Sequence, residues 1–344
     1  MTLPPPSATA IGDAVDDAGI ALSGGGIAAV LIGRNEGARL LRCLASVQGV
    51  DRVVYVDSAS TDGSVEAAQA AGAEVITLDM SRPFTAARAR NAGIDALRQG
   101  GQPDLVQFID GDCELQPGWL DRATAFLADH PKVAVVCGRR RERFPEASAY
   151  NRNCDREWDT PIGRARSCGG DALMRMAALD EVGGYNPGLI AGEEPEMCVR
   201  LRARGWDIWR LDVEMTLHDA ALTRFGQFWK RARRGGHAWA EGAAMHGAPP
   251  ERHGVAGMRR ALLWGVALPL VILVLTLIIG PGALLLALVY PLQIARLARR
   301  EGGARQDWQQ AALLTAGKFA EAAGVLEYHW RRLRGRPSEL IEYK

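Results

Sequence analysis

The sequence predicts an α/β fold: a doubly wound, mostly parallel sheet, followed by a transmembrane helical hairpin and amphipathic helices. Between residues 27 and 137, short apolar runs alternate with amphipathic stretches of helical spacing, the pattern of a sheet with crossover helices. A polar loop follows each apolar run, so these loops should open on one edge of the sheet. The uncharged run over residues 261–295 predicts the hairpin.

The first half of the chain is expected to alternate between strands and helices. The strands are short apolar runs, and the helices carry apolar residues at helical spacing. Expected strands cover residues 27–32, 53–56, 74–78, 105–109 and 133–137. Expected helices cover residues 39–47, 65–71, 86–97 and 119–128. Two more short strands are expected at residues 208–211 and 214–217.

Composition excludes several classes of protein. The 344-residue chain has a formal net charge of +1, so bulk charge does not favour a nucleic-acid partner. Its six cysteines are scattered without a C-x-x-C pair, which argues against a structural zinc site and a disulfide framework. Reduced thiols fit a cytosolic compartment. Residues 1–26 lack the pattern of a secretory signal and are expected to form a flexible leader.

Two carboxylates follow the apolar run of residues 105–109. Asp110 and Asp112 are one residue apart, so in an extended backbone they point to the same side. Gly111 between them allows a turn or a close approach. At the carboxyl end of a strand such a pair can hold Mg²⁺ or Mn²⁺ against a diphosphate. A simple Asp-Gly-Asp turn is the alternative.

Two further side chains of the first half are candidates for ligand binding. Asp57 ends the strand over residues 53–56, where a carboxylate can accept a hydrogen bond from a nucleobase or a ribose hydroxyl. Arg90 could pair with a phosphate or a base carbonyl, or it could lie on a solvated helix face. Neither G-x-G-x-x-G nor G-x-x-x-x-G-K-[ST] follows the first strand, so a Rossmann dinucleotide site and a P-loop are not expected.

Four runs, in this order and at these spacings, resemble the family 2 glycosyltransferases, which are inverting sugar-nucleotide enzymes of the GT-A fold. They are AVLIGRNEG, VDSASTDGS, ARNAG and DGD, starting at residues 29, 56, 89 and 110. The resemblance covers residues 27–245. It implies that Asp57 holds the nucleobase and that the loop from Arg34 to Glu36 lines the nucleotide. It also implies that Asp110 meets the ribose or the metal, and that Asp112 holds the metal on the diphosphate.

The second half of the expected catalytic domain supplies acceptor-side residues and a general base. In the resembled family, the region of Gly170 and Asp171 borders the acceptor pocket, although a buried tight turn also explains the glycine pair at residues 169–170. Glu194 matches the position of the base that deprotonates the acceptor hydroxyl. The family usually shows Glu-Asp where this chain has Glu-Glu, so Glu193 is the alternative. Simple capping of a helix start also explains this acidic run.

Three other features have both a functional and a structural explanation. His218 is a possible third metal ligand, or it touches the diphosphate, or it is structural. The basic cluster at residues 139–143 fits a solvated strand end better than a phosphate site. Trp229, Arg233 and Arg234 belong to a helix that mixes aromatic and cationic residues, which fits a helix lying in the membrane interface. The Gln-x-x-Arg-Trp of the family's processive polysaccharide synthases is not found near here, which favours addition of a single sugar.

The C-terminal part is expected to attach the chain to a membrane. The hairpin domain spans residues 261–299, with helices at 261–279 and 282–298 separated by a Gly-Pro-Gly turn. A re-entrant hairpin and a buried hairpin of a soluble protein are the alternatives. Arginines flank both ends, so both flanks and the catalytic domain should be cytoplasmic, at the inner (plasma) membrane. Residues 300–344 form an amphipathic tail that lies on the membrane or packs under the catalytic domain.

These features together predict a membrane-anchored inverting glycosyltransferase. It would use a divalent metal, Mn²⁺ or Mg²⁺, to move one sugar from a nucleotide-sugar donor, with a UDP-sugar favoured. The acceptor would be a lipid-linked glycan in exopolysaccharide or cell-envelope assembly. One alternative is a sugar-phosphate nucleotidyltransferase, which the missing Gly-rich, Lys-bearing loop disfavours. The other is an inactive membrane scaffold, which the full set of acidic candidates disfavours.

Overall fold

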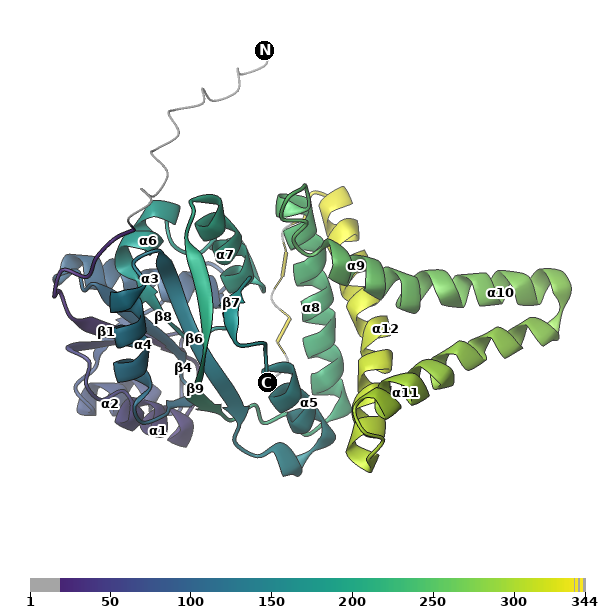
Figure 1. Cartoon of the computed structure of the whole chain (residues 1–344), viewed down its shortest axis with the longest axis horizontal. Helices are drawn as coiled ribbons and strands as arrows, with labels where there is room; N and C mark the ends of the chain where they lie inside the picture. Colours follow the sequence, from purple (N-terminus) through teal and green to yellow (C-terminus); the bar gives the residue numbers. More distant parts are fainter. Residues whose placement is uncertain (1–18, 337, 340, 343–344) are drawn as a thin grey trace, which may run out of the picture.

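A computed structural model describes residues 19–336, 338, 339, 341 and 342, with a sheet-based part and a helical part (Figure 1). Most of the expected leader, residues 1–18, lies outside the described residues. The sheet order is β3-β2-β1-β4-β8-β6-β9-β5, with β7 paired to β9. The strands are β1 (Ile27–Gly33), β2 (Arg52–Asp57), β3 (Glu74–Thr77), β4 (Leu105–Asp110), β5 (Cys113–Leu115), β6 (Val133–Glu142), β7 (Gly163–Ala165), β8 (Ala172–Arg175) and β9 (Asp207–His218).

The parallel half of the sheet confirms the α/β prediction. Strands β3, β2, β1 and β4 are all parallel neighbours, so their carboxyl ends share one edge. Beyond β4 the sheet is mixed, because β8 is antiparallel to both β4 and β6. The two strands expected at residues 208–211 and 214–217 form one continuous β9 instead. The pairing of β9 with β6 shifts register between residues 137 and 140 of β6 but continues on both sides of these shifts. The apparent break between the two expected strands is therefore an irregularity within one strand.

Seven α-helices accompany the described sheet strands, and a 3₁₀ turn, η1 (Pro145–Ala147), precedes the fifth. They are α1 (Ala38–Ser46), α2 (Ser64–Ala70), α3 (Ala86–Gln99), α4 (Trp119–Asp129), α5 (Ala149–Glu157), α6 (Met176–Val182) and α7 (Glu193–Ala203). Helix α3 begins after Thr85, whose hydroxyl accepts a hydrogen bond from the backbone N–H of Arg88. Gly93 of this helix faces Val30 of β1 so closely that an added Cβ would lie 2.4 Å from its side chain. This contact seats α3 directly on the sheet.

The helical part follows the sheet. It consists of α8 (Phe225–His246), α9 (Val255–Leu262), the π-helical η2 (Leu263–Ala267), α10 (Leu268–Ile279), the 3₁₀ segment η3 (Pro281–Leu288), α11 (Val289–Arg300) and α12 (Arg305–Leu333). Figure 1 shows α10 and α11 projecting away from the sheet and joining at their far ends. Two helical stretches, Val255–Ile279 and Pro281–Arg300, are long and apolar enough to cross a membrane. Only 6% and 11% of their most apolar windows are buried.

The tail packs under the catalytic domain, one of the two expected arrangements. Helix α12 lies along α8 (Figure 1), and glycines of each helix lie against the backbone of the other. A Cβ on Gly236 would meet the carbonyl oxygen of Glu321 at 1.9 Å, and one on Gly324 would meet that of Arg233 at 1.9 Å. The two backbones therefore touch. Arg233 also pairs with Glu327 of α12 at 2.6 Å.

This packing differs from the expectation that α8 lies in the membrane interface. Phe228 is buried and stacks near Tyr150 of α5, with ring centroids 5.7 Å apart. Trp229 is half-buried beside Phe225, whereas Arg234 lines an internal cleft. Phe228, Arg231 and Arg233 therefore make contacts within the protein, whereas Phe225 is 50% exposed.

The glycine contacts between α8 and α12 give a stability prediction. Gly236→Ala should destabilise the α8–α12 contact by about 1–3 kcal/mol, because backbone atoms would have to move apart. Gly235→Ala is the matched control, since no atom lies within 4 Å of its added Cβ. The control should stabilise α8 by up to about 1 kcal/mol through helix propensity. Thermal unfolding in detergent measures both changes, and equal melting temperatures for the two variants would contradict this description.

Candidate active site

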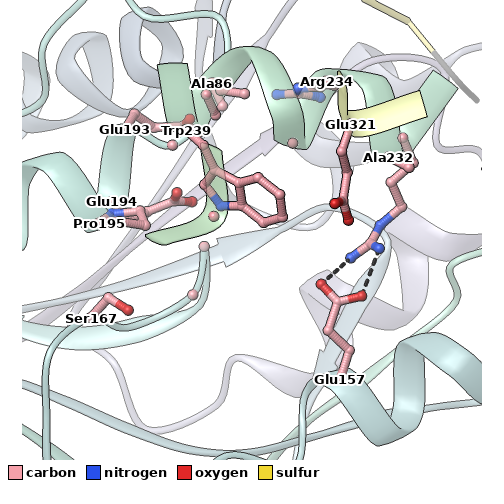
Figure 2. A pocket seen from close by; sticks show the side chains of 18 of the residues that line it. Ala86, Glu157, Ser167, Glu193, Glu194, Pro195, Ala232, Arg234, Trp239 and Glu321 are labelled. Carbon is pink, nitrogen blue, oxygen red and sulfur yellow. Dashed lines mark hydrogen bonds and ion pairs between the residues drawn. The ribbon is translucent and has the colours of Figure 1, made fainter. Parts of the chain in front are cut away.

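A cleft of about 1590 Å³ opens where β1 and β4 end. One wall comes from the loop after β1, the start of α3 and the start of α7. The opposite wall comes from α8, α9 and α12. Figure 2 shows Glu194 of α7 and Trp239 of α8 both pointing into this cavity. Among the residues singled out from the sequence, the cleft is lined by Arg34, Glu36, Arg90, Asp110, Asp112, Gly170, Glu193, Glu194 and Arg234.

Arg90 gathers three carboxylates at the centre of this cleft. Its guanidinium lies 2.7 Å from Asp110 and 3.0 Å from both Glu193 and Glu194. The Arg90 side chain is only 2% exposed, so these pairs lie in a medium where charge interactions are strong. The sequence suggested that Arg90 binds phosphate or lies on a solvated helix face. The structure rules out the solvated face and shows Arg90 holding the acidic side chains together.

Gly170 makes this convergence possible because it has no side chain. An added Cβ would lie 2.5 Å from Arg90, 2.9 Å from Asp110 and 3.1 Å from Glu194. Any other residue would have to displace at least one of these groups. Gly170 therefore forms part of the floor of the cleft beside the candidate base.

The start of α7 presents both base candidates. Glu193 follows Gly192, which takes a left-handed conformation (φ 78°) that favours glycine. The side chain of Glu194 is 13% exposed to the cleft, against 6% for Glu193. Burial, followed by the charge of Glu193, raises the pKa of Glu194 to about 7, whereas Arg90 opposes the rise. A carboxyl group with this pKa can take up and release a proton near neutral pH.

Asp112 and His218 form a potential metal site beside these carboxylates. Oδ2 of Asp112 lies 3.1 Å from Nε2 of His218, and with Cys113 they offer three ligand atoms within 4.8 Å of one another. Burial lowers the pKa of His218 to about 4, so the imidazole is neutral near pH 7 and can act as a ligand. Carboxylate ligands such as that of Asp112 suit Mg²⁺ and Mn²⁺. The residues therefore fit the divalent cation that the sequence predicted.

Five predicted site residues do not line the cleft: Asp57, Asp171, His218, Trp229 and Arg233. Asp57 is 1% exposed and accepts hydrogen bonds from the Tyr55 hydroxyl (3.1 Å) and the Ser60 N–H (2.9 Å). Asp171 is fully buried, so its carboxylate is not an acceptor-facing group. It accepts from the backbone N–H of Asp110 at 3.0 Å and thereby supports the end of β4. The apolar residues around Asp171 in sequence gave no sign of this contact, which joins strands far apart in the chain.

Arg34 lines the side of the cleft where the nucleotide is expected. Its guanidinium lies over the ring of Phe84, 4.8 Å from the ring centroid, and pairs with Glu342 at 3.4 Å.

Arg140 is a cleft residue that the sequence analysis undervalued. It belongs to the basic cluster that was interpreted as a solvated strand end. Instead it lines the cleft and pairs with the buried Asp171 at 3.0 Å. Its position on a long β6 strand, with side chains alternating in direction, was the available signal.

Comparisons with known proteins point to the family that the sequence resembles. Residues 29–181 match the family described as Glycosyl transferase family 2. The chain is 26% identical over 202 residues to a pre-mycofactocin glycosyltransferase of Mycobacterium tuberculosis, covering 54% of this chain and 41% of that protein. It is 28% identical over 193 residues to the succinoglycan biosynthesis protein ExoA of Rhizobium meliloti, covering 52% and 57%. The matches thus span about half the length of these relatives.

A solved structure extends the likeness beyond the matched half. The mannosyltransferase PcManGT from Pyrobaculum calidifontis, in complex with GDP-Man and Mn²⁺, superposes with a TM-score of 0.61 at 20% identity. The superposition covers 87% of this chain and 86% of that one. At this level of identity the similarity shows a common fold.

Proposed function

We propose that this chain is a family 2 glycosyltransferase with the GT-A fold, an inverting enzyme that adds one sugar to a lipid-linked acceptor at a membrane. One observation carries this proposal. Glu194, Asp110 and Asp112 come from separate elements, α7, β4 and the turn after β4, yet all line the same cleft. This arrangement places a base candidate beside carboxylates that can hold a cation.

In the proposed reaction Glu194 accepts the proton of the acceptor hydroxyl as its oxygen attacks the anomeric carbon of the donor sugar. Glu193 is the alternative base. Arg90 fixes the orientation of both side chains through its 3.0 Å pairs. Asp112 would hold the cation, with Asp110 and His218 as further candidate ligands. When bound, Mn²⁺ or Mg²⁺ supplies positive charge that stabilises the leaving nucleoside diphosphate.

The donor is proposed to be a nucleotide sugar, with uridine favoured by the family resemblance. The loop from Arg34 to Glu36 lines the cleft where the nucleotide is expected. The Pyrobaculum structure holds GDP-Man, so a guanosine donor is a second choice. Asp57 is proposed to hold the nucleobase, which requires it to exchange its present hydrogen bond to Ser60 or Tyr55.

The membrane role rests on the exposed hairpin. Leu277, Ile278 and Ile279 are 70–77% exposed at the end of α10, an arrangement unfavourable in water. Arginines lie at both ends of the pair of helices, which favours a cytoplasmic catalytic domain at the inner membrane. A membrane-bound enzyme facing the cytoplasm can reach both soluble nucleotide sugars and lipid-linked glycans.

A transfer assay tests the proposal. The full chain in lipid nanodiscs is incubated with radiolabelled nucleotide sugars, Mn²⁺ and a lipid extract. We expect label to enter the organic phase and nucleoside diphosphate to accumulate. Pyrophosphate release from a nucleoside triphosphate and a sugar phosphate would instead indicate nucleotidyl transfer. Folded protein that neither transfers nor hydrolyses any donor would refute the proposal.

The raised pKa of Glu194 predicts a pH profile. Glu194 acts as a base only when ionised, so the rate should rise with pH through a midpoint near pH 7 and level off about one unit above it. Arg90, Glu193 and Asp110 are the charged groups that set this pKa. Glu193→Gln removes a negative neighbour, so the midpoint should move to lower pH while the maximal rate is kept. A profile that falls through pH 7 would show that another group acts as the base.

The hairpin predicts a topology that cysteine labelling can measure. Gly282 is exposed at the start of η3, next to the turn that follows α10, and all six native cysteines are buried. In intact expressing cells a membrane-impermeant maleimide should label Gly282→Cys. The control Ala304→Cys lies in the exposed link to α12 and should react only after lysis. If neither site reacts before lysis, the hairpin is re-entrant.

A further inference from the structure

The catalytic cleft continues past Glu194 to the base of the hairpin. Its far wall includes Arg252, which precedes α9, and Arg260, which belongs to α9. Apolar side chains from three other elements complete this wall. The apolar lining residues are Trp264, Leu297, Leu313 and Leu314. One cavity therefore joins the candidate base to the foot of the exposed apolar helices.

Positive charge is unbalanced at this far end. Most cationic side chains of the cleft have acidic partners. Arg231 pairs with Glu157 at 2.8 Å (Figure 2), and Lys318 pairs with Glu321 at 2.6 Å. Arg156 pairs with Asp307 at 2.8 Å, and Arg300 pairs with Glu301 at 2.9 Å. In the part of the chain that the structure describes, Arg252 and Arg260 have neither a side-chain hydrogen bond nor an ion pair within 4 Å. Both are exposed and line the cleft. Arg260 interacts with Glu321 only beyond ion-pair distance, so both guanidinium groups keep their N–H donors for an anion.

The apolar wall beside them leads out of the cleft. Trp264 belongs to η2, directly after α9, and Leu297 to α11, so both stand where the hairpin meets the cleft. Leu263 and Leu270 belong to the same helical stretch as Trp264 and are 56% and 54% exposed. A ligand that matches the whole cavity has a polar end, an anionic middle and an apolar tail.

We propose that Arg252 and Arg260 bind the phosphate group of an amphiphilic acceptor. Its apolar chain lies along Trp264 and Leu297, and its hydroxyl-bearing end extends toward Glu194. This inference rests on the proposed transferase function and specifies the class of its acceptor. Guanidinium groups form strong, often bidentate hydrogen bonds with phosphate, so two such groups beside an apolar wall select a phosphate-bearing lipid over a neutral glycan.

Binding to short probes tests the assignment. The full chain in phosphatidylcholine nanodiscs is titrated by calorimetry with farnesyl phosphate, farnesol, inorganic phosphate and phosphatidylglycerol. We expect saturable binding of farnesyl phosphate. The dissociation constants of farnesol and of inorganic phosphate should each be at least about 10-fold higher than that of farnesyl phosphate. Arg260→Ala and Arg252→Ala should each weaken farnesyl phosphate binding by about 10-fold, the loss of one charge-assisted contact.

Arg259→Ala is the matched control. Arg259 is the exposed neighbour of Arg260 on α9 and does not line the cleft. Equal effects of Arg259→Ala and Arg260→Ala would overturn the proposal, because general membrane electrostatics would then explain the binding. Equal binding of phosphatidylglycerol would also overturn it and identify a site for phospholipid head groups.

Donor binding separates this proposal from the proposed function. Binding of uridine and guanosine diphosphates with Mn²⁺, measured in the same samples, should be unchanged in all three variants. If nucleotide binds but farnesyl phosphate does not, the acceptor assignment fails and the transferase proposal survives. If neither nucleotide binds, the proposed function itself fails.

Discussion

Replacing Glu194 with Gln should lower the rate of sugar transfer by about 100-fold to 10,000-fold, the usual contribution of a general base. The amide keeps the shape of the side chain but cannot accept the proton. Its contacts with Arg90 would weaken, yet Arg90 keeps Asp110 and Glu193 as partners. Initial rates with saturating donor and acceptor measure the effect. Nucleotide binding should be retained, because the base acts on the acceptor.

Glu193→Gln is the matched control for this experiment. The two glutamates are neighbours on α7 and lie equally close to Arg90. If Glu194 is the base, Glu193→Gln keeps most of the activity. If the larger loss follows Glu193→Gln, the base assignment moves to Glu193, which is the less exposed of the two. Equal, small losses in both variants would contradict a carboxylate base on α7.

Asp112→Asn should weaken metal binding by more than about 100-fold and reduce transfer in proportion. Replacing a residue that only hydrogen-bonds to a metal ligand already lowers metal affinity by about 10–100-fold. Replacing a charged ligand should therefore lower the affinity further. His218, 3.1 Å from Asp112, would remain as a ligand. Activity titrated against Mn²⁺ concentration measures the shift. Excess Mn²⁺ should partly rescue Asp112→Asn and leave Glu194→Gln inactive.

Asp121→Asn serves as the control for this charge change. Asp121 is exposed in the first turn of α4 and does not line the cleft. The Mn²⁺ dependence of this variant should match that of the unmodified enzyme. A wild-type Mn²⁺ dependence for Asp112→Asn would mean that the cation is held elsewhere or not used.

Much of the catalytic fold could be predicted because its signals are local. The strands β1, β2 and β4 are short apolar runs that end in polar loops, and parallel order places those loops on one edge. This reasoning brought Asp110 and Asp112 to the cleft. The same reasoning could not predict the position of Asp171. Only the antiparallel pairing of β8 with β4 shows that the Asp171 carboxylate accepts a hydrogen bond from the end of β4.

Contacts between distant segments could not be predicted. Arg90 and Glu193 are separated by 103 positions, and the pattern of α3 alone allows Arg90 to face solvent. The role of α8 was missed for a similar reason. Aromatic and cationic residues on one helix suit a membrane surface as well as a protein interface. Only the touching backbones at Gly236 and Gly324 show that α12 covers this helix.

The most direct test of the account locates the cation and the nucleotide together. A structure of the full chain with uridine diphosphate and Mn²⁺, with anomalous scattering recorded at the manganese edge, supplies both positions. The account predicts a manganese peak about 2.0–2.6 Å from a carboxylate oxygen of Asp112, touching the diphosphate within the cleft that Glu194 lines. A nucleotide bound outside this cleft, or a manganese peak away from Asp112, would contradict it.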